Sequence, residues 1–171
     1  AKKIKAGWVV NVQGDLPFVR PQTITRTLRA LRRDRSIPMG TARTPIFRKE
    51  DLHNPNVVKV VADSRGRALY FSRAPIPWPR DHFGDDGQLQ SLPPGVEYRR
   101  HIGIYGYRVK LLNDFVRWPP CELERTECLE QLRAMWNGAF IHVADADEAP
   151  PAGVDTREDL ERVRDLLNAV N

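Results

Sequence analysis

Polar residues suited to substrate chemistry follow an apolar run near the start of this 171-residue chain. Gly7–Pro17, GWVVNVQGDLP, takes an apolar strand directly into the tight polar turn Gln13-Gly14-Asp15, which Pro17 closes. Buried parallel strands read as continuous apolar runs, and open α/β sheets bind ligands beyond the carboxyl ends of their strands. We therefore expect a buried parallel strand here, with the Gln13 amide and the Asp15 carboxylate at the edge where chemistry takes place.

Four other positions carry side chains that bind ligands, and each also has a plainer interpretation. Arg73 ends an apolar run, where a guanidinium can fork onto a carboxylate or simply cap the following loop. His101 and Tyr105 are four apart in a strand pattern and so share one face, yet both also suit a satisfied core. Asp155 precedes a helix pattern and, like Asp15 in an Asx-turn, is explained by local structure alone.

Composition argues against several classes of function. The net charge of +5 comes from scattered arginines without interleaved aromatics, which disfavours nucleic acid and favours a small anionic substrate. Cys121 and Cys128 have no second Cys/His pair at ligand spacing, so we expect reduced core thiols and no zinc. No Ser/His/Asp or Cys/His nucleophile pattern is evident. Without a membrane-spanning run or a signal peptide, the sequence predicts a cytoplasmic protein.

The elements that position these residues mix helices and strands, which predicts one α/β domain over 1–171. The first helix opens at Pro21, with Ile24, Leu28 and Leu31 recurring on one face. Strands are expected over Pro38–Arg43, Val57–Ala62, Ala68–Ser72, Ile102–Tyr107 and Phe140–Val143, the second and third joined as a hairpin. Proline-punctuated residues 74–100 predict a long loop.

The C-terminal part predicts two longer helices, after a short one that Pro119-Pro120 ends. Glu122–Asn137 reads as one continuous helix closed by Gly138. Its expected buried stripe is Cys128, Leu129, Leu132, Met135 and Trp136, which leaves Glu127, Glu130, Gln131 and Ala134 on other faces, available to the hydroxyls of a polyol. The last helix starts at Thr156 and is expected to bury Leu160, Val163 and Leu167.

The motifs together resemble the 3-deoxy-manno-octulosonate cytidylyltransferases, or CMP-KDO synthetases. The matching segments occur in order over essentially the whole chain: NVQGD (11–15), NPNVVKVV (54–61), ALYFSRAPIPW (68–78), RHIGIYGYR (100–108), LEQLR (129–133) and GVDT-EDLERVR (153–164). The resemblance implies an enzyme that transfers CMP from CTP to the sugar acid KDO, releasing pyrophosphate, for lipopolysaccharide synthesis. It also implies a homodimer and a Rossmann-like α/β nucleotidyltransferase core with an inserted antiparallel hairpin region, placed at roughly 68–118 and serving dimerisation and sugar binding.

The resemblance assigns roles to individual residues. Asp15 and Asp155 match the ligands of a catalytic Mg²⁺ ion. KDO-binding positions fall on Gln13, Arg73, His101, Tyr105, Glu130 and Gln131, and Arg80 is a weaker candidate for contacting phosphate. Leu16 departs from the family, which more often has Glu beside the metal ligand.

The lysine-rich start, Ala1–Ala6, reads as the last turn of a helix, so we expect the chain to begin in mid-fold. The family's N-terminal loop for the triphosphate and cytosine has no counterpart here, which leaves the sugar-acid and Mg²⁺ half of the site. Two alternatives stay open: a non-catalytic remnant that folds and dimerises, and a sister cytidylyltransferase for another octulosonic or nonulosonic acid.

Overall fold

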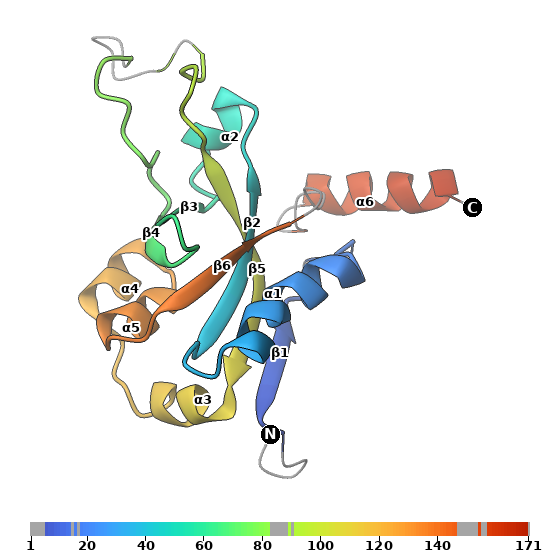
Figure 1. The fold of residues 1–171 in the computed structure, drawn as a ribbon. Coiled ribbons are helices and arrows are strands. Elements are labelled where there is room, and N and C mark those ends of the chain that lie inside the picture. The colour runs from blue at the N-terminus through green and yellow to red at the C-terminus, as the bar shows by residue number, and fades with distance from the viewer. Residues whose placement is uncertain are drawn as a thin grey trace.

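A computed structural model describes residues 6–14, 16, 18–82, 89, 91–146, 154 and 157–170. Within these residues, six strands form one mixed sheet in the order β4-β3-β5-β2-β6, with β1 also paired to β5. The strands are β1 Trp8–Val12, β2 Met39–Pro45, β3 Lys59–Ala62, β4 Ala68–Ser72, β5 Arg99–Arg108 and β6 Ile141–Asp145. The α/β prediction is therefore confirmed, and each expected strand is found near its predicted bounds (Figure 1).

The first strand differs from the expectation of a buried parallel strand. β1 runs antiparallel to β5, from Trp8 opposite Arg108 to Val12 opposite Ile104. Only β2 and β6 are parallel among the described strands. Because β1 has a single described neighbour, Trp8 and Val12 remain 40% and 41% exposed. An apolar run fixes neither strand direction nor the number of neighbours, which explains the error.

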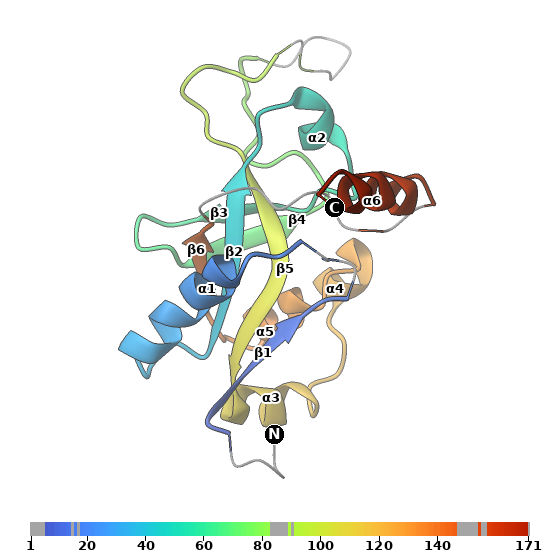
Figure 2. The same cartoon turned by 90° about the vertical axis from the view of Figure 1, so that its right-hand side faces the viewer.

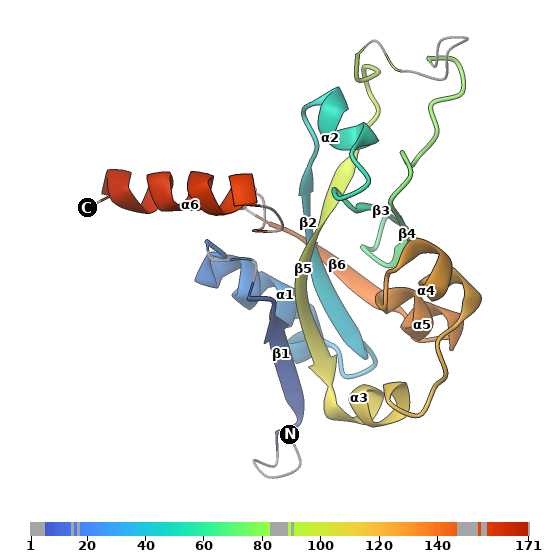
Figure 3. The same ribbon diagram turned by 180° about the vertical axis from the view of Figure 1, so that it is seen from behind.

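Helix α1, Pro21–Arg33, covers one face of the sheet, whereas α3–α5 cover the other (Figures 1 and 3). The close approach of α1 to the sheet depends on two glycines that pair across neighbouring strands, Gly40 of β2 and Gly106 of β5. A Cβ at Gly40 would lie 2.5 Å from Leu31 Cδ1 and 2.8 Å from the carbonyl oxygen of Thr27. The helix therefore packs directly on backbone. Of its predicted apolar positions, Leu31 is buried and Ile24 and Leu28 are half-buried, whereas the other buried residues are Thr23 and Thr27.

The hairpin expected between Val57 and Ser72 is confirmed, since β3 and β4 pair antiparallel. In its turn, the Asp63 carboxylate accepts hydrogen bonds from the backbone N–H groups of Arg65 and Arg67 at 2.8 and 2.9 Å. Gly66 takes a φ of 77°, which suits glycine. A short helix, α2 (Lys49–His53), lies beyond the end of β2 beside the proline-rich loop (Figure 2).

The single helix predicted over Glu122–Asn137 is instead two, α4 (Glu122–Glu127) and α5 (Gln131–Trp136). Cys128 breaks it with a left-handed φ of 51°. Gly138 does close α5, in a Schellman arrangement with Gly138 N–H and Ala139 N–H bonded to preceding carbonyls. The break rotates the second half, which corrects the predicted faces: Cys128 and Trp136 are exposed, whereas Gln131 and Ala134 are buried.

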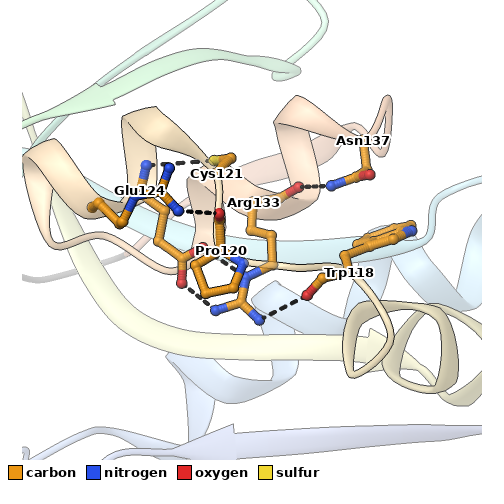
Figure 4. A network of polar contacts seen from close by, with 7 residues as sticks. Trp118, Pro120, Cys121, Glu124, Arg133 and Asn137 are labelled. Carbon is orange, nitrogen blue, oxygen red and sulfur yellow. Dashed lines mark hydrogen bonds and ion pairs between the residues drawn. The ribbon is translucent and has the colours of Figure 1, made fainter.

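An ion pair between α4 and α5 fixes the angle between them (Figure 4). Arg133 Nε donates to Glu124 Oε2 at 2.6 Å, and Arg133 Nη2 bonds the other carboxylate oxygen. The Arg133 guanidinium also lies over the ring of Phe115 at 4.5 Å. Phe115 ends α3 (Val109–Phe115), so this cation joins three helices. It holds the Glu124 pKa below its usual value.

The last helix, α6 (Arg157–Val170), extends away from the sheet (Figure 3). Val163 is buried as predicted, but Leu160 and Leu167 are 38% and 50% exposed, against expectation. The helix end expected at Ala1–Ala6 falls largely outside the described residues. No helix in the described part of the chain has the length and apolar character needed to cross a membrane.

Candidate functional site

A polar cavity of about 510 Å³ lies on the face of the sheet that α4 and α5 cover. All six residues predicted to bind the sugar acid line it: Gln13, Arg73, His101, Tyr105, Glu130 and Gln131. Its other described lining residues are Leu16, Asn56, Val58, Arg100, Gly103, Cys128 and Leu129. Arg80, the weaker phosphate candidate, is exposed and is not among these lining residues.

Strand β5 supplies the floor of the cavity through alternate residues, His101, Gly103 and Tyr105, which share a face. The middle position carries no side chain, and this creates room for Gln13. A Cβ at Gly103 would collide with Gln13 Oε1. The side-chain amide of Gln13, the first residue after β1, therefore reaches into the cavity over Gly103 of β5, although the two residues are distant in sequence.

His101 is held as a neutral ring by the strand beside it. The Thr41 hydroxyl lies 2.8 Å from His101 Nε2, 2.8 Å from the Ile104 carbonyl oxygen and 3.1 Å from that of Ile102. Carbonyls only accept, so the single hydroxyl proton goes to one of them and Nε2 must be the donor. Burial, with Arg100 nearby, lowers the pKa of His101 to about 3. The ring is thus uncharged, with its proton on Nε2.

Arg73 fastens three segments of the cavity wall together. Its Nε donates to the Glu127 carbonyl oxygen at 2.7 Å, Nη1 to that of Pro55 at 2.8 Å, and Nη2 to that of Cys128 at 3.4 Å. The Glu127 carboxylate in turn accepts from the Arg73 backbone N–H at 2.9 Å. The guanidinium therefore bonds carbonyls of distant segments and not those of the loop that follows it, and it also lines the cavity.

The start of α5 places two polar side chains against the cavity, Glu130 exposed and Gln131 only 3% exposed. Within the described residues, Gln131 Nε2 is buried without a hydrogen-bond partner. A buried donor left unpaired is costly, so this amide suits a ligand oxygen. Both residues also line a second, more apolar cavity of about 320 Å³ between β1 and α3.

Tyr105 completes an aromatic row along β5. Its ring lies 5.3 Å from that of His101 and is stacked on Tyr107 at 5.7 Å. Burial raises the pKa of Tyr105 well above its ordinary value, so the phenol keeps its proton and can donate a hydrogen bond. The cavity thus combines neutral polar side chains with the two cations Arg73 and Arg100.

Sequence reasoning missed several residues that build this site, among them Thr41, Asn56 and Lys59. Asn56 and Lys59 lie within NPNVVKVV, so the motif marked their segment without distinguishing them. Thr41 had no local signal, because its partner His101 is 60 residues away. Glu127 was expected on a face open to the hydroxyls of a polyol, but its carboxylate instead accepts hydrogen bonds from Ser72 Oγ and the Arg73 backbone N–H.

The expected Mg²⁺ ligands, Asp15 and Asp155, lie outside the described residues. Gln13 and Leu16, which flank Asp15 in sequence, both line the polar cavity. Among the side chains that the structure describes, no group of three His, Cys, Asp or Glu is arranged to hold a metal ion.

Comparisons with known proteins agree with one another. A sequence model of the family described as cytidylyltransferase matches residues 1–145. The 3-deoxy-manno-octulosonate cytidylyltransferase of Pseudomonas fluorescens strain Pf-5 is 58% identical over 161 residues, which cover 94% of this chain and 63% of the relative. The enzyme of the same name from Pseudomonas syringae pv. syringae strain B728a is 58% identical over 159 residues, covering 93% and 62%.

The fold gives the same result. A solved structure described as CMP:2-keto-3-deoxy-manno-octonic acid synthetase complexed with CTP matches with a TM-score of 0.87 at 36% identity. The match covers 99% of this chain and 65% of that one. The mixed sheet is therefore that of a nucleotidyltransferase, and the chain spans less than two thirds of the length of these relatives.

Proposed function

Because this chain belongs to the cytidylyltransferase family, we propose that the protein transfers CMP from CTP to KDO, giving CMP-KDO and pyrophosphate for lipopolysaccharide synthesis. One observation carries the proposal. Six side chains that match the KDO-binding positions of the family, from four separate parts of the chain, line a single polar cavity. The cavity of about 510 Å³ lies within the range of small-ligand pockets.

Each side chain contributes a group that a polyhydroxy acid requires. The Arg73 guanidinium faces the cavity as a cation for the KDO carboxylate. The unpaired Gln131 amide and the carboxylate of Glu130 pair with sugar hydroxyls, as do the Tyr105 phenol as a donor and the remaining ring nitrogen of His101 as an acceptor. Neutrality of the ring and the phenol at physiological pH makes these contacts insensitive to small pH changes.

The described residues supply the sugar-acid side of the reaction, and Asp15 and Asp155 are proposed to hold Mg²⁺. Carboxylates together with nucleotide phosphates suit this hard cation, which neutralises charge on the phosphate oxygens and lowers the pKa of an attacking hydroxyl when bound. The contribution of the chain itself is positioning: it holds the sugar acid in one orientation, which is the main demand of phosphoryl-type transfer.

The region 68–118 is proposed as the part that serves sugar binding and assembly into a homodimer. β5 lies within it and supplies His101, Gly103 and Tyr105 to the cavity, which supports the first of these roles.

Calorimetric titration of KDO into the protein, followed by pyrophosphate release with CTP, KDO and Mg²⁺, tests the proposal. Gly103→Ala displaces the Gln13 amide and should weaken KDO binding about tenfold, the value of one hydrogen bond. Gly7→Ala meets no atom within 4 Å and serves as the matched control. Asp15→Asn should abolish pyrophosphate release while KDO still binds. Absence of KDO binding to the unmodified protein, or equal binding by both glycine variants, would refute the assignment.

A further inference from the structure

A fully buried lysine lies directly behind the cavity wall. Lys59, the first residue of β3, has no exposed surface, although it is not itself among the residues lining the cavity. Its Nζ donates a hydrogen bond to the carbonyl oxygen of Asn54 at 3.0 Å. Burying an ammonium group is expensive unless it is paired and hydrogen-bonded, so its position calls for a physical explanation.

The carbonyl that Lys59 binds belongs to a turn that forms part of the cavity wall. Asn54 Oδ1 accepts from the Asn56 backbone N–H at 2.9 Å, and Asn56 lines the cavity. The next carbonyl, that of Pro55, accepts from Arg73 Nη1. Two cations therefore hold two successive carbonyls of this turn, one from behind the wall and one at the cavity surface.

Charged groups from each neighbouring element face Lys59. Arg73 lowers its pKa and Glu127 of α4 raises it, while burial is the largest cause of a net decrease to about 8. Arg100 of β5 is its cross-strand partner. Burial and the nearby Glu127 carboxylate raise the pKa of Tyr70 of β4.

We propose that Lys59 is a positioning residue for the polar cavity. Its buried ammonium group fixes the Asn54 carbonyl, and thereby the turn carrying Asn56 and the orientation of Arg73, in the arrangement that receives a carboxylate. The identity of the ligand, KDO, rests on the proposed function, whereas the role of Lys59 in holding the turn does not.

Loss of the Lys59 proton leaves a neutral amine, which holds the Asn54 carbonyl more weakly than the ammonium does, so KDO affinity falls as the pH rises through about 8. If only the charged form of Lys59 holds the cavity wall in its binding arrangement, KDO affinity at pH 9.5 is about thirtyfold lower than at low pH. The KDO carboxylate does not titrate in this range, and neither does His101, whose pKa is about 3. Because the Cys128 thiol also lines the cavity, every protein in the experiment carries Cys128→Ser, so that this thiol cannot contribute to the pH dependence.

The test follows the turn and the ligand separately. In the protein without ligand, the backbone amide signal of Asn56 is followed by NMR between pH 6.5 and 10, together with the ¹³Cε signals of labelled lysines. We expect a shared midpoint near pH 8 for Lys59 and Asn56. Lys59→Met, of similar length and without charge, should abolish the Asn56 transition. KDO titrations at pH 7 and 9.5 then compare Lys59→Met with Lys110→Met, whose ammonium is exposed.

Lys59→Met should bind KDO about tenfold more weakly at pH 7 and show no further loss at pH 9.5. Lys110→Met should behave as the unmodified protein, and Lys59→Arg, which does not titrate, should bind equally at both pH values. An Asn56 signal that ignores the Lys59 titration overturns the inference even if KDO binds. Failure of KDO to bind at any pH overturns the proposed function, while a shared Lys59–Asn56 midpoint still supports the positioning role.

Discussion

Neutral, buried His101 makes the fold sensitive to acid, and replacing it by glutamine measures how much. The folded ring has a pKa of about 3, whereas the unfolded chain titrates near the ordinary value of 6.5. Between these values only the unfolded state binds the proton, so stability is fully present above pH 6.5 and is lost as the pH falls. pH 4 lies about 2.5 units below the pKa of the unfolded chain. At about 1.4 kcal/mol per unit, the free energy of unfolding is therefore lower by about 3 kcal/mol at pH 4 than above pH 6.5.

Urea unfolding followed by tryptophan fluorescence at pH 7 and pH 4 provides the measurement. His101→Gln retains an N–H donor for Thr41 and cannot titrate, so its free energy of unfolding should fall by about 3 kcal/mol less between the two pH values than that of the unmodified protein. His82→Gln, at an exposed position, controls for the loss of any histidine. Parallel pH dependence in the unmodified protein and His101→Gln would show that the ring is not held neutral, and the description of the cavity floor would be wrong.

Two further predictions concern packing and the helix pair. Gly40→Ala places a Cβ 2.5 Å from Leu31 Cδ1 and against helix backbone, so it should lower the free energy of unfolding by about 1–3 kcal/mol, whereas Gly7→Ala should change it by less than about 0.5 kcal/mol. Arg133→Met removes one partner of a largely buried ion pair and should cost about 3–5 kcal/mol in urea unfolding. Arg164→Met, from an exposed pair, should cost less than about 1 kcal/mol; equal losses at both arginines would contradict the burial argument.

Local patterns predicted the parts of this fold that local interactions decide. The hairpin was predictable because Asp63 and Gly66 form its turn within a few residues. The shared face of His101 and Tyr105 follows from even spacing in any strand. Local patterns did not predict that the six cavity residues lie together, because that grouping came from the family resemblance and not from periodicity.

The errors arose where distant residues override the local pattern. The sequence over Glu122–Asn137 suits a continuous helix, but Arg73 bonds the carbonyls of Glu127 and Cys128 from 54 and 55 residues away and stabilises the break. The direction of β1 likewise depends on β5, which lies nearly a hundred positions later. No periodicity within either segment contains this information.

Strand β2, which lies between β5 and β6, has consequences for how the chain is made. Its two neighbours, β5 and β6, both lie downstream, and β6 ends at Asp145, 100 residues after β2 ends at Pro45 (145 − 45). At synthesis rates of about 5–20 residues per second, a nascent chain exposes the hydrogen-bonding edges of β2 for about 5–20 s before its last partner is translated. A ribosome that stalls before Ile141 therefore leaves open the edge of β2 that pairs with β6, and this edge of residues 39–45 is one that a nascent-chain chaperone has reason to shield.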